Sequence, residues 1–150
     1  AFTQGQMITV TGIDNLNEWW IDPDFFEKQS DGALKFLPIN GDYRVTANAV
    51  LKYFSVMALK DGKPAKLQDD GTGAIWAIGK GIGKPSVTSS EVGWEPSKAL
   101  CLAQVASKKY QLTLKAGETL KTSGDPEVIS FKFFHQNDWG GEFGNYANSI

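Results

Sequence analysis

Hydrophobic and polar residues alternate with a period of two along most of the chain. Successive side chains of a β-strand point to opposite faces of a sheet, so this alternation is typical of half-buried strands. Turn-forming pairs such as Asn40-Gly41 and Asp61-Gly62 separate the alternating segments. The pattern predicts strands over residues 7–11, 34–37, 42–47, 50–59, 74–78, 98–105, 109–114 and 128–136. Short strands at this spacing indicate an all-β fold of the sandwich type.

One segment carries signals for a helix. Asp22 precedes Pro23, and a second acidic residue, Asp24, follows at once. An Asp at the N-cap, a proline at the first helical position and early negative charge all favour a helix start. We therefore expect one short helix, of one or two turns, over residues 22–28.

The alternation also predicts which residues form the core. In the last predicted strand Phe131 and Phe133 fall on the face expected to be buried, and Lys132 and Phe134 fall on the opposite face. Six residues are expected to share one core: Tyr110, Leu112, Leu114, Phe131, Phe133 and Trp76.

The chain has 150 residues, which suits a single β-sandwich domain over residues 1–150. A polar segment with three glycines and no aromatic residue, residues 60–73, offers an alternative boundary. In that alternative residues 1–59 are the closing part of one module and residues 74–150 are a second module, with 60–73 as the linker. A unit of about 60 residues buries a small share of its surface, which favours the single domain.

The charge balance argues against nucleic acid as a partner. Fifteen Lys and Arg residues face 17 Asp and Glu residues, for a formal net charge of −2, and Arg44 is the only arginine. Clustered positive charge dominates phosphate contacts, so we expect no nucleic-acid partner. No apolar run in the sequence approaches the ~20 residues of a membrane span.

Residues with catalytic or metal-binding chemistry are few. His135 is the only histidine and Cys101 the only cysteine, so neither a nucleophile–base pair nor a zinc site is indicated. The run Gly79–Lys84 lacks the spacing of a dinucleotide- or phosphate-binding loop and is interpreted as a flexible turn. We expect no catalytic residues, no metal and no cofactor. A small hydrolase with paired carboxylates is the enzyme alternative.

Two of the five tryptophans lie in loops. Trp94 follows Gly93 and precedes a Glu-Pro pair, and Trp139 lies between Asp138 and Gly140. An exposed indole ring is favourable where a ligand covers it, and the C–H face of a sugar stacks well on a π surface. We therefore expect Trp94 and Trp139 to be stacking platforms of a ligand-binding site. In the alternative, both rings cap the ends of the sandwich core.

Two polar residues are expected beside these rings as hydroxyl partners. Lys132 lies on the face opposite the predicted core, next to Phe134, and Asn137 precedes Trp139 by two residues. The alternative for Lys132 is a solvated side chain that keeps an edge strand from pairing with another chain.

Three motifs carry a resemblance to known carbohydrate-binding modules: Ile78–Ser86, Gly93-Trp94-Glu95-Pro96 and Phe131–Phe143. The last two resemble the starch- and glycogen-binding β-sandwich modules, in which two Trp and a Lys form the glucan site. All three are similar to the repeated modules of the SusE/SusF-like outer-membrane surface glycan-binding lipoproteins of Bacteroidetes. The resemblance implies an immunoglobulin-like or carbohydrate-binding-module-like β-sandwich.

The resemblance also implies a cellular setting. In that family the modules bind a polysaccharide or oligosaccharide at the outer membrane, on the cell surface, and catalyse nothing. A lipid anchor upstream of Ala1 would then be the only link to the membrane, and other outer-membrane glycan-uptake components would be partners. The alternative is a structural spacer or protein-interaction domain of the same fold with no glycan site. Exposure of Trp94 and Trp139 distinguishes the two.

Overall fold

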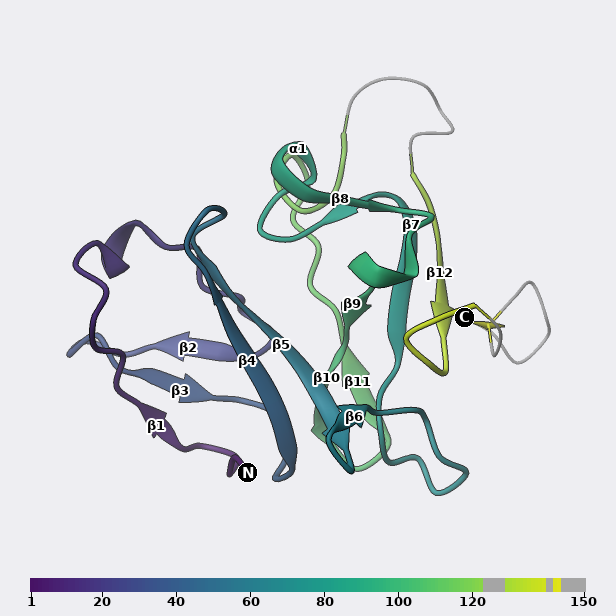
Figure 1. Cartoon of the computed structure of the whole chain (residues 1–150), viewed down its shortest axis with the longest axis horizontal. Helices are drawn as coiled ribbons and strands as arrows, with labels where there is room; N and C mark the ends of the chain where they lie inside the picture. Colours follow the sequence, from purple (N-terminus) through teal and green to yellow (C-terminus); the bar gives the residue numbers. More distant parts are fainter. Residues whose placement is uncertain (123–128, 140–141, 144–150) are drawn as a thin grey trace.

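The computed structural model describes residues 1–122, 129–139 and 142–143, which form an all-β, sandwich-like fold with one short α-helix among them (Figure 1). The strands are β1 (Met7–Ile8), β2 (Phe26–Lys28), β3 (Leu34–Phe36), β4 (Asp42–Asn48), β5 (Tyr53–Lys60), β6 (Lys63–Pro64), β7 (Trp76–Gly83), β8 (Glu91–Gly93), β9 (Leu100–Cys101), β10 (Ala103–Ala106), β11 (Lys109–Gln111), β12 (Ser130–Phe134) and β13 (Glu142–Phe143). The helical elements are α1 (Val87–Ser90) and the 3-10 turns η1 (Leu16–Glu18) and η2 (Pro96–Lys98).

The described strands form four antiparallel sheets. Their strand orders are β1-β3-β2, β4-β5-β6, β10-β11 and β13-β12-β7-β8, and β9 also pairs with β7. In Figure 1 the β1–β3 sheet lies on the left, the β4–β5 ribbon crosses the middle, and β7, β8, β9 and β12 lie on the right. The all-β sandwich-like prediction is confirmed.

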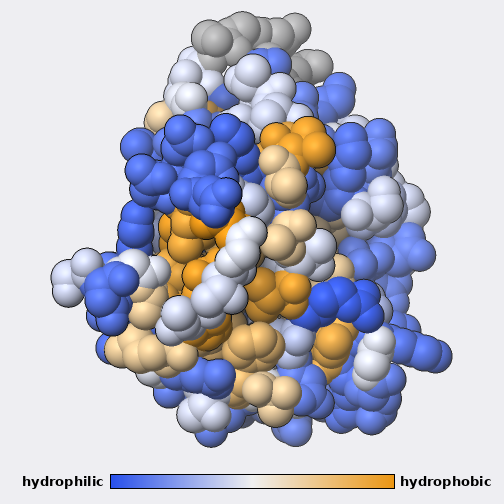
Figure 2. Space-filling model, turned by 60° about the vertical axis from the view of Figure 1, so that its left-hand side comes forward, coloured by the Kyte–Doolittle hydropathy of each residue, from blue (hydrophilic) through white to orange (hydrophobic). Residues whose placement is uncertain are grey.

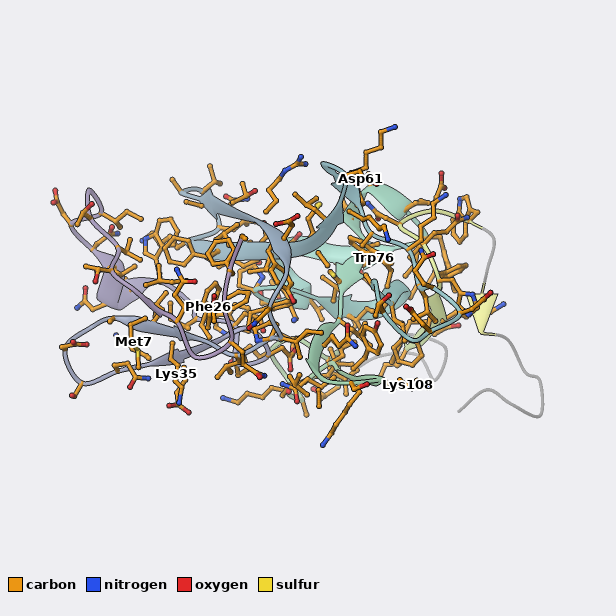
Figure 3. The ribbon with its side chains drawn as sticks, turned by 90° about the horizontal axis from the view of Figure 1, so that it is seen from below. Met7, Phe26, Lys35, Asp61, Trp76 and Lys108 are labelled. Carbon is orange, nitrogen blue, oxygen red and sulfur yellow. The ribbon has the colours of Figure 1, made fainter. Side chains whose placement is uncertain are left out.

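Two groups of buried side chains hold these sheets together. The first core contains Trp19, Phe25, Phe26, Leu34, Phe36, Phe54, Val56 and Ala103. The second core contains Ala65, Ala74, Trp76, Ala77, Ile78, Ile82, Val92, Cys101, Leu102 and Phe134. Phe26 belongs to the first core and Trp76 to the second, and Figure 3 labels both residues, with Phe26 nearer the β1–β3 side of the molecule.

The segment 60–73 packs onto the second core. Ala65 is buried there, and its carbonyl oxygen accepts a hydrogen bond of 3.0 Å from the indole nitrogen of Trp76. β6, within the same segment, pairs with β5. The division of the chain at this segment stays a prediction.

The second core contains the residues expected in it, with one correction. Trp76 is buried, and the partly buried Tyr110, Leu112, Leu114, Phe131 and Phe133 pack against this core, as predicted. The prediction that Phe134 faces away from the core is wrong, because its side chain is only 1% exposed. Phe134 pairs in register with Trp76, and the ring of Trp139 covers it at 5.7 Å. Both faces of β12 are therefore partly covered.

Residues 22–25 form a single turn that leads into β2, and the helix predicted over residues 22–28 is wrong. The backbone nitrogens of Phe25 and Phe26 both donate to the Asp22 carbonyl oxygen, at 3.2 and 2.9 Å, and the chain then becomes extended. The only α-helix in the described part of the chain is the four-residue α1, which the Ser86 side chain caps.

The two acidic residues of that turn belong to a buried charge cluster. The Lys84 ammonium lies 2.7 Å from Asp22 Oδ2 and 3.0 Å from Asp24 Oδ2, and all three side chains are buried. Asp24 also accepts hydrogen bonds from the backbone nitrogen and hydroxyl of Thr113, at 2.9 and 2.7 Å. Asp22 Oδ1 still accepts a local hydrogen bond of 3.0 Å from the backbone nitrogen of Asp24, but the contacts of Asp24 with Lys84 and Thr113 hold the chain in a single turn that does not continue as a helix.

The run Gly79–Lys84 is not the flexible turn predicted from its glycines. Residues 79–83 continue β7, which lies between β12 and β8 at the centre of its sheet. The glycines permit close backbone approach: a Cβ atom on Gly79 would lie 2.2 Å from the Cα atom of Phe131. Glycine at position 79 thus allows β7 and β12 to pack closely, and it does not make the segment a flexible turn.

Cys101 is expected to be inert towards thiol reagents in the folded protein. Its side chain is 5% exposed, and burial raises the pKa of the thiol to about 11. Since the thiolate is the reactive form, both effects suppress labelling at neutral pH. We expect stoichiometric labelling by 5,5′-dithiobis(2-nitrobenzoate) only after denaturation. Rapid labelling of the native protein would contradict this.

Candidate functional site

The two loop tryptophans meet at the surface of the structure. Trp94 and Trp139 lie 45 positions apart in the sequence, yet their ring centroids are 6.3 Å apart and the ring planes are inclined by only 29°. Trp94 is 38% exposed and Trp139 is 47% exposed. Together they form a nearly parallel aromatic pair that is open to solvent, here called the Trp94–Trp139 pair.

The arrangement of the central sheet brings these two loops together. β8, which precedes Trp94, and β12, which precedes Trp139, pair with opposite edges of β7. The rings can therefore meet only if both loops reach across the same face of β7. The Phe134 ring packs edge-on against the Trp139 ring with an interplanar angle of 74°, so Trp139 lies on the buried Phe134.

Local backbone features orient the two loops. Gly93 has a φ of +59°, a conformation that glycine adopts without strain, and turns the chain out of β8 into the Trp94 loop. On the other side, the backbone nitrogen of Trp139 donates to Asp138 Oδ1 at 2.7 Å. The side-chain amide of Gln136 donates to the carbonyl oxygen of Trp139. The Trp139 loop is thus held by hydrogen bonds to its backbone, and Gly93 sets the direction in which the Trp94 loop leaves β8.

Lys132 lies on the face of β12 that also carries Phe134, because side chains two positions apart in a strand share a face. Phe134 contacts Trp139, so Lys132 projects from the same side of the sheet as the Trp94–Trp139 pair. Its side chain is exposed. Contact between Lys132 and a ligand held by the pair stays a prediction.

Asn137 lies in the same loop as Trp139, but its side chain is not fully available. Its amide oxygen is buried and has no hydrogen-bond partner in the described part of the chain. A buried amide oxygen without a partner costs about 1–3 kcal/mol. Because this atom is covered, the amide nitrogen is the group through which Asn137 could contact a ligand.

Sequence reasoning missed a second concave feature, a polar cleft beside the β4–β5 ribbon with a volume of about 250 Å³. Arg44, Thr46 and Asn48 alternate along β4 and line one wall. The alternating polar residues of β4 are visible in the sequence. A strand face that is fully polar contacts water, a ligand or another polar surface. What the sequence did not show is that a second sheet stands opposite that face.

The described residues contain no group of three or more His, Cys, Asp or Glu side chains placed to hold a metal ion. Within the same ranges, no helix has the length and apolar character needed to cross a membrane.

The fold and the surface define an all-β, sandwich-like protein with an exposed aromatic pair on its central sheet. Comparison with protein families assigns the chain to a family. Residues 70–149, just over half of the chain, match the family described as "Domain of unknown function (DUF5121)", and the chain belongs to that family. Residues 1–67 match a second family, "Domain of unknown function (DUF5125)". No curated protein and no solved structure matches the chain.

The two family matches meet between residues 67 and 70. The Trp94–Trp139 pair lies wholly within the segment matched by the first family. The polar cleft, in contrast, has one wall from each segment, since Arg44 belongs to residues 1–67 and Lys98 to residues 70–149.

Proposed function

We propose that this protein is a non-catalytic carbohydrate-binding protein that holds a neutral polysaccharide or oligosaccharide on the Trp94–Trp139 pair. The observation that carries the proposal is the meeting of two exposed, nearly parallel indole rings from separate loops. A pair of large apolar rings in water is unfavourable unless a partner covers it, and the C–H face of a sugar ring is such a partner. Lys132, and Asn137 through its amide nitrogen, are proposed as hydroxyl partners beside the rings.

The proposed binding is weak at a single site. A neutral sugar offers no charge to pair with, so its affinity comes from ring stacking and a few directional hydrogen bonds. An aromatic contact contributes about 0.5–1.5 kcal/mol beyond its buried area. One or two such contacts correspond to a dissociation constant nearer ~1 mM than ~1 nM. Several such sites along one assembly would bind a polymer usefully through avidity.

The proposed setting is the surface of a bacterial outer membrane. It rests on the resemblance of the Gly93–Pro96 and Phe131–Phe143 motifs to the SusE/SusF-like surface lipoproteins. In that setting a lipid anchor outside this chain attaches the protein, and other glycan-uptake components are its neighbours. Detection of the native protein in surface-labelled outer-membrane fractions of its source cells tests this part of the proposal.

Replacing Trp139 or Trp94 with Ala is expected to weaken glycan binding about tenfold, which corresponds to about 1.4 kcal/mol, because each change removes one stacking surface. Isothermal titration calorimetry on wild type and both variants, against a panel of soluble α- and β-glucans and other plant glycans, measures this. Affinity should change little with ionic strength, since the ligand is uncharged.

The matched control is Val50→Ala, which removes apolar surface from a residue that is 89% exposed and belongs to neither loop. Its affinity should equal that of wild type. If wild type binds a glycan and neither Trp variant weakens the binding, the site lies elsewhere on the molecule.

One observation favours the second candidate, a spacer or protein-interaction domain. Several residues packed against the first core are only half-buried, among them Ile8, Val10, Ile13 and Leu16. Figure 2, which brings the β1–β5 side forward, shows apolar atoms at the surface between hydrophilic residues. If no glycan on a broad panel binds, this second function replaces the first.

A further inference from the structure

The two faces of the β4–β5 ribbon differ in chemistry. Tyr43, Val45, Phe54 and Val56 pack into or against the first core. The opposite face carries register pairs in which Arg44 lies beside Met57, Thr46 beside Ser55 and Asn48 beside Tyr53. This second face lines the polar cleft. The ribbon therefore separates an apolar core from a hollow whose lining mixes polar and charged groups with apolar side chains.

The opposite wall of the cleft comes from α1, β8, β9 and η2. It contributes the hydroxyl groups of Ser90 and Ser97, the ammonium of Lys98, and the apolar side chains of Val92 and Leu100. Among the described residues, no side-chain hydrogen bond is formed by the hydroxyls of Thr46, Ser55, Ser90 and Ser97. Four hydroxyls thus remain available to a ligand that enters the cleft.

Arg44 is the one charged side chain lining the cleft that has no ion-pair partner among the described residues, and the cluster of Asp22, Asp24 and Lys84 beside the cleft holds two carboxylates and one ammonium. The Lys84 ammonium at the floor is already bound by Asp22 and Asp24, within 3.0 Å of each. Lys98, at the rim, has the Glu95 carboxylate 3.8 Å away. Arg44 makes no ion pair with any residue in the described ranges. A guanidinium presents donors in a planar fork that matches a carboxylate with two parallel hydrogen bonds.

The size of the cleft limits what it can hold. Its volume of about 250 Å³ is below the roughly 300–1,000 Å³ typical of sites for drug-sized ligands. One monosaccharide unit fits this space, whereas a stacked chain of sugars does not. The half-buried Tyr53 and Leu51 supply apolar contact beside the hydroxyl groups.

We propose that the polar cleft between the β4–β5 ribbon and the β8–β9 wall is a second binding site, specific for one acidic monosaccharide unit such as a uronic acid. Arg44 holds the carboxylate, and the hydroxyl groups of Thr46, Ser55 and Ser97 bind the hydroxyls of the sugar. The site is separate from the Trp94–Trp139 pair and does not depend on the function proposed for that pair.

Calorimetry of the whole chain with sodium D-glucuronate and D-galacturonate tests the site, with D-glucose and inorganic phosphate as comparison ligands. A uronate is expected to bind with a dissociation constant of about 1 mM, at least tenfold more tightly than glucose. Arg44→Gln should weaken it at least tenfold, Arg44→Lys less, and Thr46→Val a few-fold. Added salt should weaken binding, because it screens the exposed guanidinium.

Two control variants show whether uronate binds in the cleft rather than elsewhere on the surface. Lys28→Gln removes the same charge from an exposed position on β2, away from the cleft residues, and should leave uronate binding unchanged. The Trp94→Ala/Trp139→Ala double variant should also bind uronate as wild type does, whether or not the aromatic pair binds a neutral glycan. The proposal is overturned if uronate binds no better than glucose, if phosphate binds equally well, or if Arg44→Gln has no effect.

Discussion

Replacing Lys84 with Met is expected to destabilise the folded protein by about 3–5 kcal/mol at neutral pH. The Lys84 ammonium lies within 3.0 Å of the Asp22 and Asp24 carboxylates, and all three side chains are buried. Removing the cation leaves two buried carboxylates with no positive partner, which is far less favourable than the native cluster. Urea denaturation followed by tryptophan fluorescence measures the loss in free energy of unfolding.

The pH dependence of this loss identifies its electrostatic cause. Burial raises the pKa of Asp22 above its usual 3.8, so the uncompensated carboxylate accepts a proton readily as the pH falls. The difference between wild type and Lys84→Met should therefore shrink as the pH approaches 3.8. Burial alone lowers the pKa of Lys84, but the two carboxylates outweigh it and hold that pKa above 10.5. The stability that Lys84 provides is thus complete below pH 10.5 and is lost as the pH rises through its raised pKa.

Two variants control this experiment. Lys52→Met removes an exposed lysine that lies 3.5 Å from Glu18, and its effect should be much smaller than that of Lys84→Met because solvent screens that pair. Adding Asp22→Asn to Lys84→Met should recover part of the lost stability by removing one buried negative charge. A loss that is independent of pH, or no recovery in the double variant, would show that lost packing rather than charge is the cause.

Replacing Gly79 with Ala is expected to cost roughly 4 kcal/mol or more, or to prevent folding. A Cβ atom at this position would lie 2.2 Å from the Cα atom of Phe131 and 2.3 Å from the carbonyl oxygen of Ser130. Both are backbone atoms of β12, so the overlap is relieved only if the β7–β12 pairing opens. Thermal unfolding by circular dichroism measures the loss, and the fraction of soluble protein covers the case in which the variant does not fold.

The matched control is Gly62→Ala in the turn between β5 and β6. Gly62 has a φ of +76°, and a Cβ atom there would meet nothing within 4 Å. Its cost should be about 1–2 kcal/mol, from the backbone conformation alone. If Gly79→Ala costs no more than this control, the close approach of β12 is not what requires glycine at that position.

Several features of the fold were predictable because they depend on local periodicity. The alternation in residues 42–47 corresponds to β4, the first three residues of the strand predicted over 109–114 form β11, and Trp76 lies in the core as expected. The alternation pattern gave the wrong burial for Phe134. A strand pattern assigns only one face to the core, and it does not show that the Trp139 loop folds back over the other face. The helix-start signals at Asp22 failed for a similar reason, because the ion pair with a lysine 62 positions away is not local information.

The candidate site was predictable only in part. The glycine-flanked settings of Trp94 and Trp139 indicated exposed rings, and both rings are exposed. That the two rings form a pair was not derivable from either loop alone, since their meeting depends on β8 and β12 lying on opposite edges of β7. The polar cleft was missed because its two walls come from parts of the chain more than 40 positions apart, Arg44 on one side and Ser90 on the other.

The sequence by itself determined the all-β class, the positions of strands such as β4 and β5 and the loop location of the two tryptophans, because period-two patterning and turn residues act between near neighbours in the chain. Only the tertiary structure decided that Lys84 neutralises Asp22 and Asp24, that Gly79 lies against β12, and that Trp94 meets Trp139. Each of these depends on the free energy of contacts between segments that lie 45 or more positions apart. Such contacts form only when the sheets pack together, so they leave no periodic signal in the sequence.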